Sequence, residues 1–195
     1  GAVPAALDAS RASDGLTVSA FGDSITWGGG SSTDGPATGY PFRLERQLEA
    51  LFGGYFRVIN AGRPGETTWA GRSRLAASLP GMEADVLLLM EGVNDALYDH
   101  MFVATEYSLR MMLQTARSHG LSSVLATHTP VISNRYFTRD EQMGRILAFR
   151  PAVFRVARDF GVPVADVFEA VVSVPGWRSL LIHQQSANHP NDLGY

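Results

Sequence analysis

The stretch LTVSAFGDS, residues 16–24, joins an apolar run to a turn that ends in a serine. Its β-branched and aromatic residues, followed by glycine, are typical of a buried strand that runs into a loop. In open α/β sheets, ligands bind in the crevice outside the carboxyl ends of the strands. We therefore expect Ser24 to lie where chemistry can occur, although Gly-Asp-Ser is also common in turns, where Asp and Ser cap helices.

Three further segments place glycine or polar residues after strands of their own or near the C-terminus. They are NAGRPGET (60–67), EGVND (91–95) and NHPN (188–191). A glycine lets a backbone N–H approach a ligand, Asn94 offers a side-chain N–H, and His189 supplies the general base that a serine lacks. Since right-handed crossovers bring the ends of parallel strands to a common edge, we expect these segments to line one crevice.

In this order and spacing the four segments resemble those of the SGNH hydrolases, also called the GDSL family of lipases and esterases. The resemblance extends from Gly22 to Pro190, almost the whole chain. It implies an α/β fold, a flavodoxin-like three-layer α/β/α sandwich with a parallel five-stranded sheet. We expect a single domain at residues 16–195, preceded by a flexible segment at residues 1–15.

The resemblance also implies a role for each of four residues. Ser24 corresponds to the nucleophile and His189 to the base. The backbone N–H groups of Ser24 and Gly65 and the side-chain amide of Asn94 correspond to the oxyanion hole. The implied reaction is ester hydrolysis through an acyl-enzyme, in which the serine attacks, the oxyanion is held and water releases the acid.

Two glycines compete for the place in the oxyanion hole. The glycine of the family comes directly before an acidic residue and a threonine, which here are Glu66 and Thr67. Gly65 is therefore preferred over Gly62.

One position departs from the family pattern. The family usually has Asp three residues before the histidine, and this chain has Ser186 there. We rank three explanations in order. The first is a Ser-His dyad in which a backbone carbonyl of residues 186–188 accepts a hydrogen bond from His189. The second is another carboxylate, Asp192 or Asp166. The third is a catalytically weak or dead protein, a binding module on a hydrolase scaffold. The alternative function is accordingly that of a non-catalytic or acyl-transferring relative that binds a carbohydrate in the same crevice.

The stretches between these segments alternate between helical and strand patterns, which is typical of a parallel sheet covered by helices. Helices are expected at residues 42–52, 68–79, 103–119 and 141–160, and further strands at 56–59, 86–90, 122–126 and 162–166. Pro151 is expected to kink or split the last helix.

For four other polar residues we expect a structural role or a role secondary to that of His189. His128 also follows a strand, and we expect it to be satisfied locally. His183 is held well behind His189 as the base, because it adjoins an apolar run and lacks the following Pro-Asn. We expect Asp23 to cap or fix the turn beside Ser24, and Asp95 to anchor its loop.

Composition narrows the function classes. With 195 residues, 45% hydrophobic and 18% charged, the chain fits one domain with a full core. A formal net charge of -3 without basic clusters argues against a nucleic-acid surface. No Cys is present, no metal-ligand spacing occurs, and no apolar stretch approaches the ~20 residues of a membrane span. We therefore predict no metal, no cofactor and no membrane span.

The two ends of the chain carry weaker indications. Residues 1–10 lack the basic and apolar regions of an intact signal peptide, and they fit the stretch that follows a cleaved one. This favours a secreted or periplasmic mature form over a cytoplasmic one. The sequence stops at Tyr195, where the family normally continues into a closing helix, so we expect apolar surface near the site to be uncovered.

The substrate is the least determined feature. The loop at residues 28–39, preceded by Trp27, and residues 135–137 are expected to flank the pocket. Their polar and aromatic side chains suit a short acyl ester or an O-acetyl group on a carbohydrate, and no extended apolar segment suggests a long-chain tunnel. The glycines 28–30 lack the Lys-Ser/Thr ending of a phosphate-binding loop, which disfavours a nucleotide binder.

Overall fold

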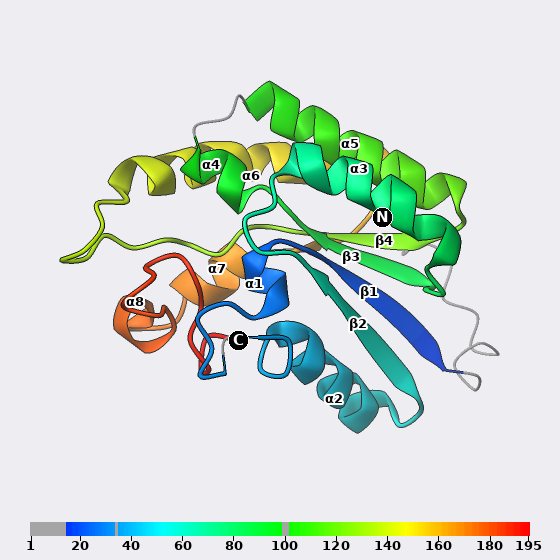
Figure 1. Cartoon of the computed structure of the whole chain (residues 1–195), viewed down its shortest axis with the longest axis horizontal. Helices are drawn as coiled ribbons and strands as arrows, with labels where there is room; N and C mark the ends of the chain where they lie inside the picture. Colours follow the sequence, from blue (N-terminus) through cyan, green and yellow to red (C-terminus); the bar gives the residue numbers. More distant parts are fainter. Residues whose placement is uncertain (1–14, 34, 99–101) are drawn as a thin grey trace.

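Five parallel strands form the centre of the computed structural model, which describes residues 15–33, 35–98 and 102–195 (Figure 1). The strands are β1 (Leu16–Gly22), β2 (Phe56–Gly62), β3 (Val86–Met90), β4 (Ser122–Ala126) and β5 (Val164–Ala165). Their order in the sheet is β2-β1-β3-β4-β5, and every pairing is parallel. The predicted α/β fold with a parallel five-stranded sheet is therefore confirmed.

Helices cover both faces of the sheet, and the three longest of one face lie together above it in Figure 1. These are α3 (Thr68–Ser78), α5 (Phe102–Ser118) and α6 (Asp140–Phe160). Helix α2 (Tyr40–Phe52) lies on the opposite face. Three short helices follow strands: α1 (Ser24–Trp27), α4 (Val93–Leu97) and α7 (Val167–Val172). A 3-10 turn at Leu79–Gly81 continues α3, and α8 (Trp177–Leu180) comes after α7.

Side chains that alternate in direction along each strand divide the hydrophobic core between the two faces of the sheet. On β1, Phe21 packs with residues of α3, α5 and α6. Its neighbours Val18 and Ala20 pack on the other side, where Leu44 of α2 covers them. Because successive strand residues point to opposite faces, this central strand is buried on both sides and delivers its carboxyl end to the crevice.

Two strands and one helix show the main differences from the sequence predictions. β2 continues to Gly62, in register with Gly22 of β1, whereas the prediction ended at residue 59. β5 is only Val164–Ala165 instead of residues 162–166. α6 runs through Pro151 as one helix, so of the two expected effects, a kink or a split, the split is wrong. Buried packing of Phe149 and Val153 on either side offsets the hydrogen bond that proline removes.

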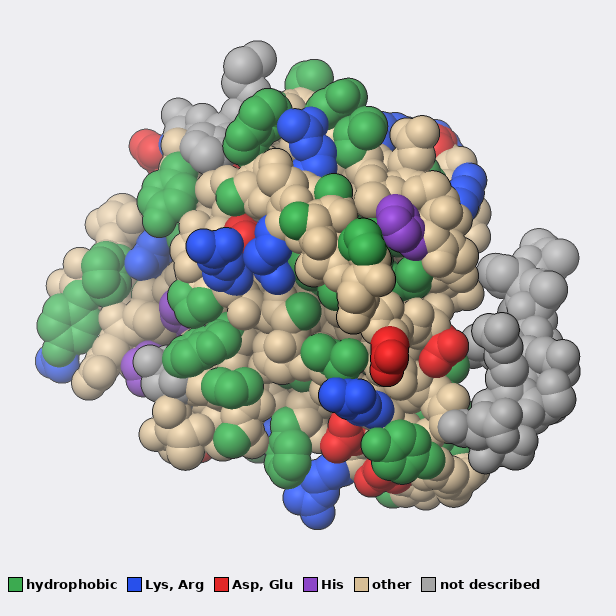
Figure 2. All heavy atoms as spheres, turned by 45° about the vertical axis from the view of Figure 1, so that its right-hand side comes forward, with side chains coloured by type: hydrophobic (Ala, Val, Ile, Leu, Met, Phe, Trp, Pro, Cys, Tyr) green, Lys and Arg blue, Asp and Glu red, His purple; other side chains and the backbone are tan. Residues whose placement is uncertain are grey.

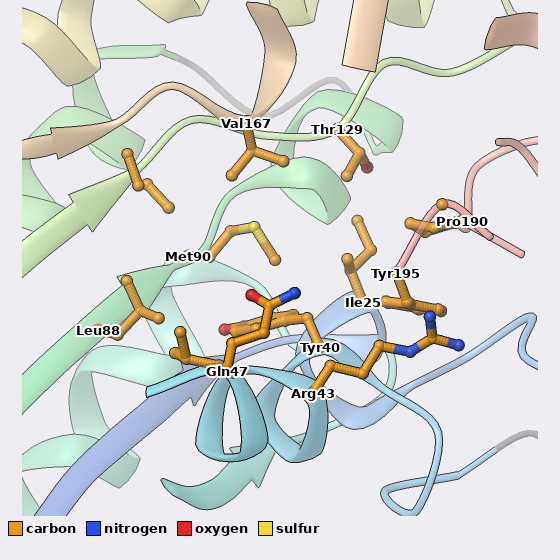
Figure 3. A pocket seen from close by; sticks show the side chains of 14 residues that line it. Ile25, Tyr40, Arg43, Gln47, Leu88, Met90, Thr129, Val167, Pro190 and Tyr195 are labelled. Atoms are coloured by element: carbon orange, nitrogen blue, oxygen red, sulfur yellow. The ribbon is translucent and has the colours of Figure 1, made fainter. Parts of the chain in front are cut away.

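An apolar cavity of about 260 Å³ opens on the sheet face that carries α2. Ile25, Met90 and Val167 lie around it, and Tyr195 borders it (Figure 3). The expected flexible segment at residues 1–15 lies outside the described residues except for Gly15.

The molecular surface mixes both signs of charge. On the face in Figure 2, arginine and acidic side chains are interspersed with hydrophobic ones. No helix in the part of the chain that the structure describes is long and apolar enough to cross a bilayer.

Candidate active site

Helix α1 begins at Ser24, directly after β1. Asp23 caps this helix, because its Oδ1 accepts the Ile25 N–H at 2.9 Å. After one turn, Gly28 ends the helix with a φ of 105°, in the left-handed region that favours glycine. The expected capping role of Asp23 is thus confirmed, and Ser24 lies at the N-terminus of a short helix at the carboxyl edge of the sheet.

The Ser24 Oγ lies 2.8 Å from Nε2 of His189, 165 positions later in the chain. The glycine run makes room for this histidine. A Cβ on Gly29 would lie 3.1 Å from the His189 ring, and one on Gly30 would lie 2.6 Å from the His189 Cβ. Tyr195 donates its hydroxyl hydrogen to the Gly29 carbonyl at 2.6 Å. The run therefore forms a wall against the histidine, a role that the sequence analysis did not foresee.

The Ser186 hydroxyl lies beside a different histidine, 3.2 Å from Nδ1 of His183. The Ser186 backbone N–H points to the same nitrogen at 3.3 Å. His183 in turn donates its backbone N–H to the His189 carbonyl at 2.9 Å. Residues 183 and 186 thus form a small polar frame behind the loop that carries His189.

The two carboxylates considered as partners for His189 have other contacts. Asp192 accepts the backbone N–H of Ser32 at 2.8 Å. Asp166 accepts the Thr127 hydroxyl at 2.9 Å and pairs with the guanidinium of Arg150. These contacts tie down the loop after α1 and the start of α7.

The loop that carries His189 is held by the segment between β4 and α6. Ile132 donates its N–H to the Ala187 carbonyl at 2.9 Å, and Arg139 donates to the Ser186 carbonyl at 3.2 Å. Asn134 donates its side-chain amide to the Gln184 carbonyl. Ala187 is fully buried with a φ of 64°, a conformation that costs an alanine about 1 kcal/mol. The surrounding contacts therefore impose the geometry of this loop.

Asn94 is buried on α4, the helix that follows β3. Its Nδ2 donates to the Glu66 carbonyl at 2.7 Å, which ties the loops after β2 and β3 together. The neighbouring Asp95 accepts the N–H and the hydroxyl of Thr68 at 2.9 and 2.7 Å. The expected anchoring role of Asp95 is therefore confirmed at the first turn of α3.

The structure separates the two candidate glycines. Gly62 belongs to β2, and its N–H donates to Asn60 Oδ1 at 2.9 Å. A Cβ at Gly62 would lie 2.2 Å from the Trp27 nitrogen, so this glycine permits β2 to pack against α1. Gly65 lies in the following loop with a φ of 76° and open space around it. Gly65 as an oxyanion donor stays a prediction.

His128 is fully enclosed, and its Nε2 lies 2.7 Å from the Glu91 carbonyl oxygen. Burial lowers the pKa of His128, so the neutral ring carries its hydrogen on Nε2 and donates to that carbonyl. The expectation of a locally satisfied histidine is confirmed.

An open depression of about 460 Å³ adjoins the Ser24–His189 pair. Its lining residues are Gly30, Ser31, His183, Gln185, Ser186 and His189. The loop at 28–39 thus borders it, as expected. Tyr136 and Phe137 are exposed, and they line neither this depression nor the apolar cavity. We take the depression as the candidate substrate site because it contains the histidine of the pair.

A buried charge cluster beneath the site was missed by the sequence analysis. Arg74 of α3 forms an ion pair with Glu66 and donates to the Ala61 carbonyl at 3.0 Å and the Gly22 carbonyl at 3.3 Å. Its guanidinium lies 3.7 Å from the centre of the Phe21 ring. The partners come from β1, β2 and the following loop, so no local sequence pattern marks this arginine.

Asp23 belongs to the same buried region. Burial, helped by the nearby carboxylates Asp95 and Glu66 and opposed by the Ile25 N–H, raises the pKa of Asp23 to about 7.

Comparison with known proteins places this geometry in a family. The model of the GDSL-like Lipase/Acylhydrolase family matches residues 20–195. A curated relative, thioesterase 1/protease 1/lysophospholipase L1 of Escherichia coli (strain K12), is 29% identical over 136 residues, which are 69% of this chain and 59% of the relative. The match thus spans less than two thirds of that protein's length.

Solved structures agree with this assignment. The lipase/acylhydrolase from Enterococcus faecalis superimposes with a TM-score of 0.79 at 27% identity, covering 92% of this chain and 89% of that one. The crystal structure of TesA superimposes with a TM-score of 0.68 at 26% identity, covering 90% and 89%. With the family model matching from β1 to the end of the sequence, the chain belongs to the GDSL-like lipase/acylhydrolase family, the SGNH hydrolases.

Proposed function

We propose that this protein is a serine esterase that hydrolyses short acyl esters or carbohydrate O-acetyl groups through an acyl-enzyme, with Ser24 as nucleophile and His189 as base. The observation that carries the proposal is the 2.8 Å contact between Ser24 Oγ and His189 Nε2. This distance is within the hydrogen-bond reach that a general base needs to take a proton from its nucleophile.

The reaction proceeds in two halves. His189 Nε2 takes the Ser24 proton as Oγ attacks the ester carbonyl. The N–H groups of Ser24 and Gly65 and the amide of Asn94 stabilise the oxyanion. Collapse of this intermediate expels the alcohol, to which His189 returns the proton. A water molecule, deprotonated by His189, then attacks the acyl-enzyme and releases the acid and Ser24.

Ser24 and His189 act as a dyad in this proposal, and the support for it is the way the loop that carries His189 is held. The hydrogen bonds from Ile132 and Arg139 hold the loop carbonyls in place and thereby orient the imidazole. Rigid placement then does part of what a charged partner does elsewhere.

The depression beside the pair supports the choice of substrate. Its side chains are polar, from Ser31, His183, Gln185 and Ser186, and it is broad and open. Hydroxyl, amide and imidazole groups of this kind hydrogen-bond to the alcohol part of a sugar ester and give a long apolar chain little to bind.

The test is hydrolysis of p-nitrophenyl acetate, p-nitrophenyl butyrate and an acetylated sugar by the wild type and two variants. We expect Ser24→Ala and His189→Ala each to lower kcat by at least about 10³-fold. His119→Ala is the matched control, because His119 is exposed at the end of α5 and should leave the rate unchanged.

A Ser24→Ala protein that keeps the wild-type rate removes Ser24 as the nucleophile. Faster turnover of a palmitoyl thioester than of any short ester would overturn the substrate class while leaving the acyl-enzyme route in place.

A further inference from the structure

Glu91 is a buried carboxyl group that the proposed mechanism does not use. It follows β3 directly, and its residue is 1% exposed. Neither of its carboxyl oxygens accepts a hydrogen bond from a donor among the described residues. An ionised carboxylate buried in this way costs several kcal/mol, because water no longer solvates it.

The titratable groups around Glu91 come from several elements. Those that interact with its carboxyl group are Asp23 before α1, Glu66 after β2, Arg74 on α3 and Tyr40 on α2. His128 after β4 contacts the Glu91 main-chain carbonyl, and Asp95 on α4 acts on Asp23 and His128. Arg74 is the cation of this group, and its Nε and Nη2 both donate to the Glu66 carboxylate. Its Nη2 lies 4.0 Å from Glu91 Oε1, beyond hydrogen-bond distance.

The carboxyl groups of Glu91 and Glu66 both lie close to Gly71, a glycine of α3. A Cβ on Gly71 would lie 3.1 Å from Glu91 Oε1 and 3.5 Å from Glu66 Oε2. The absence of a side chain at Gly71 therefore leaves room for two carboxyl groups side by side. Two carboxyls that share a site in this way hold one proton between them, because both cannot ionise.

We propose that Glu91 is a neutral carboxylic acid whose O–H donates a hydrogen bond to the Glu66 carboxylate. In this proposal the Glu91–Glu66 pair positions the oxyanion side of the active site. Neutral Glu91 supplies a donor to Glu66 and removes its own buried charge. The inference deepens the proposed function and rests on it for its kinetic part only.

Hydrogen bonds of Glu66 connect the pair to the segments that carry Asn94 and Ser24. The Glu66 main-chain carbonyl accepts the Asn94 amide at 2.7 Å. Its carboxylate holds Arg74, which donates to the Gly22 carbonyl two residues before Ser24 at 3.3 Å. Glu91 is thus a positioning residue, because it acts on Ser24 and Asn94 only through Glu66 and Arg74.

The protonation state agrees with the electrostatics of the cluster. Burial raises the pKa of Glu91 well above its ordinary value, and the charges of Asp23 and Glu66 raise it further, while Arg74 opposes them.

The first experiment is chemical unfolding of the wild type and Glu91→Gln between about pH 4 and about pH 9, and it needs no substrate. In the unfolded chain Glu91 loses its proton near the ordinary glutamate pKa of 4.5, whereas folded Glu91 keeps it. Wild-type stability therefore falls as the pH rises from there to the folded pKa. Since Gln does not titrate, the ratio of the two unfolding constants should change by about tenfold per pH unit over that window.

Glu83→Gln is the matched control for this measurement, because Glu83 is an exposed glutamate in the loop before β3. It should track the wild type at every pH. A Glu91→Gln protein whose stability differs from the wild type by the same amount at every pH would show that Glu91 is ionised in the folded state, and the proposal would be wrong.

The second experiment compares kcat and KM for p-nitrophenyl acetate. Glu91→Leu removes the donor to Glu66, so we expect kcat to fall about tenfold while KM stays within about twofold. Glu91→Gln restores a neutral donor and should recover most of kcat. A folded Glu91→Leu protein with wild-type kcat, or a Glu91→Gln protein as slow as Glu91→Leu, overturns the positioning role. If the Ser24→Ala control is also active, the proposed function fails instead.

Discussion

Asn94 illustrates how one side chain serves both structure and chemistry in the proposed mechanism. Its amide gives one hydrogen to the Glu66 carbonyl at 2.7 Å, and a primary amide has a second hydrogen to offer. The first bond fixes the side chain before substrate arrives. An oxyanion donor held in this way needs little reorganisation when negative charge develops, and this is the source of its catalytic effect.

We expect Asn94→Ala to lower kcat for p-nitrophenyl acetate by ~10² to 10³, the range seen when one oxyanion-hole donor is removed. Asn94→Asp is the matched variant, because it keeps the shape of the side chain and replaces both donor hydrogens by negative charge. It should lose at least as much activity. A rate within about threefold of the wild type in a folded Asn94→Ala protein would remove Asn94 from the mechanism.

At the scale of elements, the segment between β4 and α6 supports the loop of His189. It donates from Ile132, Asn134 and Arg139 to three successive parts of that loop. The Arg139 guanidinium also stacks on Phe137, 4.6 Å from the ring centre. Two chain segments far apart in the sequence thus share one set of hydrogen bonds, and the position of His189, the proposed base, depends on both.

We expect Arg139→Ala to lower kcat by roughly three- to tenfold, because small misplacements of a catalytic group are costly, and to lower stability by about 1 kcal/mol for the lost hydrogen bond. Arg135→Ala is the control, since Arg135 lies in the same segment and stacks on the exposed Tyr136. Steady-state kinetics and urea unfolding of both variants check this. Equal effects at the two positions would contradict a specific role for Arg139.

At the scale of the whole molecule, buried acids beneath the crevice couple stability to pH. Burial raises the pKa of Asp23 to about 7, against an ordinary value of 3.8. Between these values the folded state holds a proton that the unfolded state has released. The free energy of unfolding therefore falls as the pH rises through this window and levels off above it.

Asp23→Asn tests this contribution, because Asn keeps the acceptor that caps α1 and does not titrate. We expect the variant to have a larger free energy of unfolding than the wild type at about pH 8. This difference between the two proteins should be smaller by a few kcal/mol at about pH 4. Urea unfolding at both pH values measures the difference, and the other carboxylates cancel because both proteins contain them. A difference that does not change with pH would mean that Asp23 is charged throughout.

Much of the fold and part of the candidate site follow from local patterns. The strand at residues 86–90, the strand at 122–126 and the helix beginning at Thr68 are predictable because burial imposes a period on the sequence. The limits of β2 and β5 are not, because pairing with a neighbouring strand decides where a ladder ends. Pro151 inside α6 shows the same override, since tertiary packing outweighs an unfavourable residue.

The sequence by itself determined the α/β architecture, the four segments at one edge and the pairing of Ser24 with His189 as candidates. Only the tertiary structure decided that Ser186 lies with His183 and that Gly62 packs against Trp27. It also decided that both Glu91 and Glu66 lie near Gly71, with no donor to the Glu91 carboxyl group among the described residues. The physical reason is that periodicity and turn chemistry report on neighbours along the chain. Hydrogen bonds and buried charges join segments whose proximity depends on how the crossovers pack.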